Sequence, residues 1–113
     1  MPARRIDPGR MSATRSQTPQ WDTVSRIDVL RSIDEYDRLG AQDFFAKHGF
    51  APTRTYELLW DGRSYPPKAI LGAAHELATG RRLAPSDFEG GKAGAVRVLR
   101  KLGFTVRERA SHD

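Results

Sequence analysis

The chain has 113 residues, of which 38% are hydrophobic and none is cysteine. This length and apolar content support one small domain with a modest core, and the composition excludes disulfides and thiolate metal sites. No apolar run approaches the roughly 18 residues of a membrane-spanning helix. The arginine-rich N-terminus also lacks the hydrophobic stretch of a secretory signal. We therefore expect a cytoplasmic protein without a membrane partner.

The formal net charge of +5 is unevenly distributed. Residues 1–20 hold four arginines and one aspartate, residues 21–53 four bases and six acids, and residues 54–113 eleven bases and seven acids. Positive charge gathered in the second half of the domain is what a surface facing a polyanion would produce. A solvated basic surface explains the same pattern equally well.

Three segments differ in composition. Residues 1–20 are poor in large apolar groups and rich in Arg, Ser, Thr and Pro, which predicts a disordered basic tail. Residues 21–109 alternate apolar and polar positions with regular periods, which predicts a single folded domain. Residues 110–113 are expected to fray.

The first part of the domain predicts two consecutive helices. Apolar residues recur at helical spacing from Thr23 to Leu39. Ser25 with Asp28 matches a capping box, and Asp22 or Thr23 could serve as the cap instead. A shorter helix is predicted from Ala41 to His48, ending at Gly49. Because the connection is so short, the two helices should form a corner.

A β-hairpin and a central helix follow. The run Tyr56–Trp60 alternates as a strand, Asp61-Gly62 is typical of a type I′ turn, and Arg63–Tyr65 would pair back. Two prolines then end the pairing and suit the first turn of a helix predicted over Lys68–Thr79. The basic groups of the return strand and of this first helical turn should therefore lie close together.

The last third predicts a single turn at Ser86–Glu89, a helix over Lys92–Leu102 and a strand over Thr105–Arg109. We expect this strand to pair beside Tyr56–Trp60. The pairs Gly49-Phe50 and Gly103-Phe104 each predict a left-handed glycine followed by an aromatic that packs back on its helix. The predicted fold class is α+β, with about four helices packed on a small antiparallel sheet in a winged-helix-like outline.

A glycine-rich turn before the last helix is the first candidate binding element. Gly90, Gly91 and Lys92 could present free amides and a positive charge to a nucleic-acid phosphate. A glycine turn required for tight helix–sheet packing is an equally good explanation. The spacing does not match a nucleotide-hydrolase loop.

Basic and aromatic groups on the hairpin and the last helix are the second candidate. Trp60 is expected in the core, whereas Arg63 and Lys68 should face outward and could bind phosphates. The predicted nucleic-acid-binding set is Arg54, Arg63, Tyr65, Lys68, Gly90, Gly91, Lys92, Arg97 and Arg100.

Catalytic and metal chemistry are not indicated. The histidines are scattered, and His75 beside Glu76 is expected as a surface or half-buried pair. No pair of histidines and carboxylates has metal-ligand spacing, and no nucleophile–base arrangement emerges. We predict neither a metal nor a cofactor nor catalytic residues, and therefore no enzyme.

Several segments together resemble a known family, the N-terminal head domain of ScoMcrA-like (Mcr-type, modification-dependent) HNH restriction endonucleases. The resemblance covers about residues 23–108. It rests on Tyr36-Asp-Arg-Leu-Gly40, Phe45 to Gly49-Phe50, Asp61-Gly-Arg-Ser-Tyr65, Lys68-Ala-Ile-Leu-Gly72, Asp87-Phe88, Gly90-Gly91 and Val98 to Gly103-Phe104. One departure is Tyr65-Pro66-Pro67-Lys68, where the family often has Tyr-Asp-Ser-Lys.

In that family the head precedes a domain that flips bases or reads sulfur and a catalytic HNH domain. The present 113 residues contain no HNH motif. The resemblance therefore implies a small, non-catalytic DNA-associated module of a restriction or antiviral defence system, with DNA and a nuclease as its candidate partners. The alternative is a protein-interaction or dimerisation module that uses an apolar patch around Phe44 and Phe45. Duplex, single-stranded or modified DNA, RNA, sequence preference and oligomeric state all stay open.

Overall fold

The computed structural model describes residues 19–52 and 55–109, so the predicted tail, apart from its last two residues, and the predicted C-terminal fraying at 110–113 lie outside the described residues. The fold is α+β, as predicted, with four α-helices, two single-turn 3-10 helices and one antiparallel sheet among the described residues. In chain order the elements are η2 (Trp21–Thr23), α2 (Arg26–Leu39), α3 (Ala41–His48), β1 (Tyr56–Trp60), β2 (Arg63–Tyr65), α4 (Pro67–Thr79), η3 (Pro85–Asp87), α5 (Ala95–Lys101) and β3 (Thr105–Glu108).

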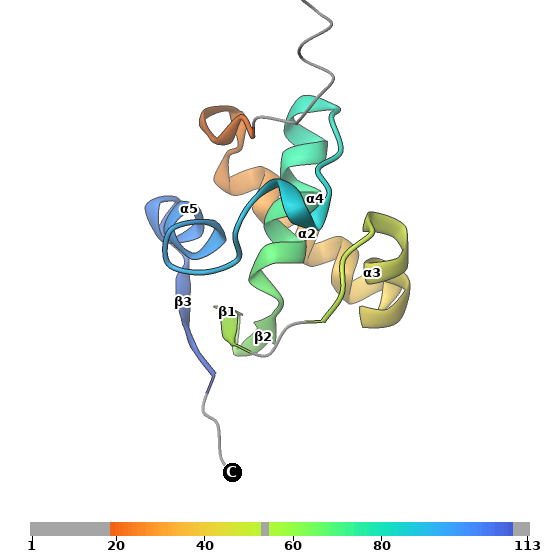
Figure 1. Cartoon of the computed structure of the whole chain (residues 1–113). Coiled ribbons are helices and arrows are strands. Elements are labelled where there is room, and N and C mark those ends of the chain that lie inside the picture. Colours follow the sequence, from red (N-terminus) through yellow and green to blue (C-terminus); the bar gives the residue numbers. More distant parts are fainter. Residues whose placement is uncertain (1–18, 53–54, 110–113) are drawn as a thin grey trace, which may run out of the picture.

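Helix α4 runs through the middle of the molecule, with α3 on one side and α5 with β3 on the other (Figure 1). Its run Ala69-Ile-Leu-Gly-Ala-Ala74 is buried all round. Small residues on this helix allow its neighbours to approach closely. A Cβ added at Gly72 would lie 2.4 Å from the Phe50 ring, so that glycine is required by packing.

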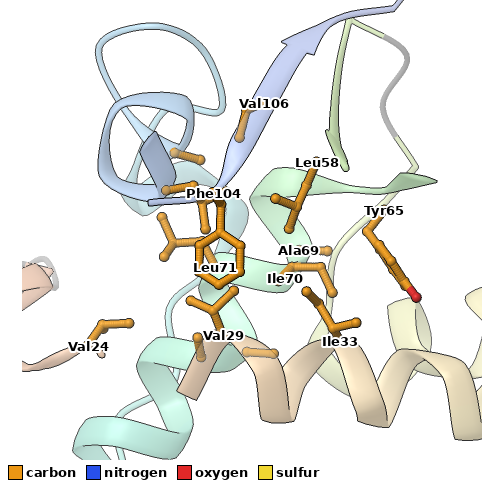
Figure 2. Close-up of a cluster of buried hydrophobic side chains, with 14 of the residues drawn as sticks. Val24, Val29, Ile33, Leu58, Tyr65, Ala69, Ile70, Leu71, Phe104 and Val106 are labelled. Atoms are coloured by element: carbon orange, nitrogen blue, oxygen red, sulfur yellow. The ribbon is translucent and has the colours of Figure 1, made fainter. Parts of the chain in front are cut away.

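The sheet has the order β2-β1-β3, and both pairings are antiparallel. The predicted hairpin is confirmed, because Asp61 and Gly62 have φ angles of 52° and 77°, as a type I′ turn requires. The predicted addition of the C-terminal strand beside β1 is also confirmed. Leu58 at the centre of β1 faces Tyr65 on β2 and Val106 on β3, and all three side chains point into the core above α4 and α2 (Figure 2).

The helix ends largely follow the predicted signals. Ser25 and Asp28 form the predicted capping box. That box places the first residue of α2 at Arg26, three residues later than predicted, while Trp21–Thr23 forms a separate 3-10 turn.

The two Gly-Phe pairs also behave as predicted. Gly49 and Gly103 have φ of 77° and 94°, and the following phenylalanine amides donate to the carbonyls five residues back.

One buried histidine joins the N-terminal turn to α4. His75 is only 1% exposed, so the expected surface pair with Glu76 is wrong. Its Nε2 accepts a hydrogen bond from the Gln20 amide at 2.9 Å, and its Nδ1 donates to the Arg81 carbonyl at 3.1 Å. Trp21 meets the His75 ring edge-on at 5.5 Å. Burial lowers the pKa of His75, which keeps the ring neutral.

A second histidine joins three helices through contacts with two glutamates. His48 on α3 lies with Nε2 2.8 Å from Glu35 of α2 and Nδ1 3.4 Å from Glu76 of α4. The second contact is an ion-pair distance without hydrogen-bond geometry. Lys47 also binds Glu35. Burial alone would raise the pKa of Glu35, but the hydrogen bonds from Lys47 and His48 outweigh it and hold that pKa below its ordinary value.

Candidate nucleic-acid interface

The predicted binding residues fall into separate surroundings. Arg63 begins β2 and lies 3.5 Å from Asp37 of α2. The hollow beside it is also lined by Asp34 and Asp61. Acids therefore offset the charge of Arg63, and a phosphate approaching here would meet net negative charge. The predicted closeness of Arg63 and Lys68 does not produce one shared pocket, because Lys68 lines a different one.

Tyr65 is a core residue, which corrects its prediction as a nucleic-acid contact. Its side chain is 3% exposed, and its ring is directed from the sheet toward the helices (Figure 2). Its hydroxyl donates to both carboxylate oxygens of Asp37, at 2.8 and 2.9 Å. Burial and this bond raise the pKa of Tyr65. The register explains the error, because Tyr65 pairs with Leu58 and both face inward.

Lys68 and the glycine turn come together, although they are more than 20 residues apart in the chain. A pocket of about 300 Å³ is lined by Lys68, Gly90, Gly91 and Tyr56, with Thr55 and Pro67. A Cβ added at Gly90 would lie 3.2 Å from Cδ of Lys68, so the glycine leaves room for the lysine side chain. The Lys68 ammonium also lies 5.3 Å from the centre of the Phe88 ring. We call this pocket the lysine pocket.

The backbone amides at the start of α5 are bonded within the glycine turn. The amides of Gly94, Ala95 and Val96 donate to the carbonyls of Gly91 and Glu89. A Cβ added at Gly94 would lie 2.0 Å from the Glu89 carbonyl oxygen. A glycine is therefore required at position 94 by the turn itself, and α5 begins at Ala95, three residues later than predicted. Lys92 lies exposed in the turn itself.

Helix α5 lines the second basic hollow, a groove of about 460 Å³ against η2. Arg97 and Lys101 lie one helical turn apart along it, with Trp21, Val98 and Leu102 between and beside them. Asp22 is the single acid that lines this groove. Both cations are exposed, and neither makes an ion pair with a described residue. The predicted set missed Lys101, although its spacing of four from Arg97 would have found it. We call this hollow the α5 groove.

The side chain of Arg100 makes hydrogen bonds within the fold. Its guanidinium donates through Nε and a terminal nitrogen to the Val106 carbonyl, at 3.2 and 2.6 Å. The residue remains exposed, so its charge still adds to the potential of α5. Arg54, the remaining predicted residue, lies outside the described residues.

Of the two residues around which an apolar docking patch was predicted, Phe45 alone is accessible. Phe44 is fully buried, and Phe45 is half-buried edge-on against Tyr36. The large apolar side chains that are exposed among the described residues are Ile27 and Leu77, on α2 and α4. In residues 19–52 and 55–109, no three histidine or carboxylate side chains gather closely enough to hold a metal ion. No helix of that part is long and apolar enough to span a bilayer.

The fold and the sequence together define the class of this protein. A family model described as the ScoMcrA-like N-terminal head domain matches residues 22–108. The chain therefore belongs to the ScoMcrA-like head-domain family, as its motifs predicted. A search of curated proteins gave no match.

A solved structure carries the same fold. It is the structure of the type IV phosphorothioation-dependent restriction endonuclease ScoMcrA, to which this chain is 33% identical with a TM-score of 0.59. The alignment covers 80% of this chain and 14% of that one. The likeness thus concerns one module of a larger endonuclease.

Proposed function

We propose that this protein is a small DNA-associated module of a restriction or antiviral defence system, which binds the phosphate backbone and is non-catalytic by itself. It would act in the cytoplasm beside a nuclease. The family relationship supports the DNA setting, since the matching structure is that of a restriction endonuclease. The observation that carries the proposal is the pair Arg97 and Lys101, exposed along the α5 groove without partners among the described residues.

Neighbouring cations extend this surface. Lys92 precedes α5 in the chain and is exposed, and Arg100 lies on the same helix. Lys68 adds a fifth charge beside the glycine turn. Arginine and lysine that are not already paired within the protein gain the most from meeting phosphates, because no ion pair must first be broken.

The test is the salt dependence of binding to a blunt, fluorescently labelled duplex, measured by anisotropy. Five phosphate contacts predict a slope of about −4 to −5 for log K against log salt, which is about a 500-fold weakening between 50 and 200 mM. The variant R97E/K101E should lower the magnitude of that slope by about two and weaken binding at every salt concentration.

The matched control is R31E/R38E on α2. It makes the same change in net charge, but on a helix where Arg38 is already paired with Asp34 at 2.9 Å. It should change the slope far less than R97E/K101E does. A wild-type slope near zero, or equal losses in the two variants, would contradict a phosphate-binding surface on α5.

A further inference from the structure

Tyr56 separates two pockets of different chemistry. On one side is the lysine pocket, where the Tyr56 ring approaches Gly91 so closely that an added Cβ would lie 3.7 Å from Cε2. On the other side is a pocket of about 240 Å³ that Tyr56 shares with Tyr36, Phe45, Pro66 and Arg109. We call the second one the aromatic pocket. One residue thus forms a wall of both.

The aromatic pocket is held by a rigid cluster of rings. Tyr36 of α2 meets Phe45 of α3 at 6.3 Å and Tyr65 of the hairpin at 5.3 Å, each edge-on. Tyr36, Phe45 and Tyr56 are only half-buried, so part of each ring remains accessible. Arg109, which follows β3, brings a guanidinium to this pocket, and its amide is fixed by a bond to the Thr55 carbonyl at 2.9 Å.

The charged residues that line the two pockets are basic, although Glu108 pairs with Tyr56 across the sheet. Among residues 19–52 and 55–109, no aspartate or glutamate lines either pocket, while Lys68 lines one and Arg109 the other. This contrasts with the hollow beside Arg63, where three aspartates gather. Aromatic surface flanked by cations suits a ligand that is a planar ring joined to an anion.

We propose that the two pockets together hold one unpaired nucleotide of DNA, with its base in the aromatic pocket and its phosphate beside Lys68. The inference rests on the proposed DNA-binding function and specifies the form of DNA. The aromatic pocket is smaller than the roughly 300–1,000 Å³ of typical ligand sites, so it fits one base and not a stacked pair. A base inside a duplex is covered on both faces by its neighbours. The nucleotide must therefore come from an overhang, a gap or an extruded position.

The experiment compares two labelled DNAs of the same duplex sequence, one blunt and one with a three-nucleotide overhang whose central base is 2-aminopurine. Wild-type protein should bind the overhang DNA about five-fold more tightly, equivalent to about 1 kcal/mol at 1.4 kcal/mol per factor of ten. The fluorescence of 2-aminopurine should fall on binding, because the base becomes stacked against tyrosine and phenylalanine rings.

Two substitutions locate the effect. Tyr56→Leu keeps an apolar side chain on β1 but removes the ring between the pockets, and Arg109→Gln removes the exposed cation at the aromatic pocket. Each should abolish most of the five-fold preference and leave binding to blunt DNA as in wild type. Circular dichroism and thermal unfolding identify a variant that does not fold, in which case the other one decides.

The outcomes separate this inference from the function on which it rests. Equal binding of the two DNAs, with steep salt dependence, would overturn the unpaired-nucleotide site and leave backbone binding intact. A preference that survives both substitutions would also overturn it. Failure to bind either DNA at low salt would overturn both proposals.

Discussion

The hollow beside Arg63, which we call the hairpin corner, and the α5 groove each present arginine to solvent. Their electrostatic surroundings are opposite. Arg63 in the corner lies 3.5 Å from Asp37, with Asp34 and Asp61 lining the same hollow. Arg97 in the groove has Lys101 one turn away and a single acid, Asp22, among the lining residues. The first surface is close to neutral or acidic, and the second is basic.

This difference shows that a net charge says little about where a polyanion binds. Two of the three acids that offset Arg63, Asp34 and Asp37, come from α2, far away in the chain, and only folding brings them beside the hairpin. Arg97 and Lys101 of α5 stay free of ion pairs because no carboxylate of the described residues lies against them, whereas Arg100 binds the Val106 carbonyl. What matters for phosphate binding is the potential of each surface, which depends on charges from all neighbouring elements.

The largest expected effect concerns the turn that positions α5. Gly94→Ala would place a Cβ 2.0 Å from the Glu89 carbonyl oxygen, an overlap that backbone must relieve. We expect a loss of about 3 kcal/mol in the free energy of unfolding, the upper end of overpacking costs. DNA affinity should fall with it, because the start of α5 shifts. Urea denaturation and anisotropy measure the two effects.

The control for Gly94→Ala is a glycine in the hairpin turn. Gly62 in the hairpin turn has φ of 77° and nothing within 4 Å of an added Cβ. Gly62→Ala should therefore cost only the left-handed conformation, about 1 kcal/mol, and leave DNA affinity unchanged. If Gly94→Ala were as mild as Gly62→Ala, the turn before α5 would not be held by the contact with Glu89.

The stability of the fold should also depend on pH, through a histidine close to the α5 groove, and this effect should be smaller than that of Gly94→Ala. Trp21 lines that groove and packs against His75, which binds the neighbouring Gln20 amide. Burial lowers the pKa of His75 from 6.5, so the unfolded chain takes up this proton at a higher pH than the folded one. Stability should therefore be complete above about pH 6.5 and fall as the pH drops toward the folded-state pKa, by at most about 1.4 kcal/mol per pH unit.

Urea denaturation of wild type and His75→Gln between pH 7.5 and 5.5 measures this effect. The other groups around the ring are Arg81, whose carbonyl accepts from Nδ1, and Thr79, whose hydroxyl lies 3.4 Å from it. The lowered pKa of Glu35 acts below about pH 4.5 and so lies outside that pH range. An equal pH slope in wild type and His75→Gln would exclude His75 as its source.

Much of the fold could be predicted because local signals determine it. Residues within a few positions of one another determine β1, the Asp61-Gly62 turn, the whole of α3 and the left-handed conformations of Gly49 and Gly103. The helix starts were less accurate. Ser25 competes with nearby Asp22 and Thr23 as a cap, and the long glycine turn before α5 resembles a helix start in sequence but is fixed by the carbonyl of Glu89.

The candidate site was harder to predict, for a physical reason. Exposure of a basic residue follows from local pattern, whereas its pairing depends on side chains that arrive from other elements. Tyr65 was predicted as a nucleic-acid contact because aromatic and basic groups share the hairpin, but the three-residue strand turns it inward onto Asp37. The lysine pocket likewise joins segments that no short motif connects.

The smallest expected effect tests whether pairing, and not position, keeps Arg63 from binding DNA. Asp37→Asn removes the carboxylate charge but keeps an oxygen that can accept from the Tyr65 hydroxyl. If the ion pair with Asp37 keeps Arg63 from binding DNA, removing it should raise the affinity for blunt duplex about two-fold, a small effect because the pair is exposed. The salt slope should steepen by up to about 0.9, the value of one phosphate contact.

Asp43→Asn on α3 makes the same charge change at another exposed position and serves as the control. Affinity that stays the same in Asp37→Asn would mean that the hairpin corner faces away from the DNA. The two regions would then differ in orientation toward the ligand and not in charge compensation.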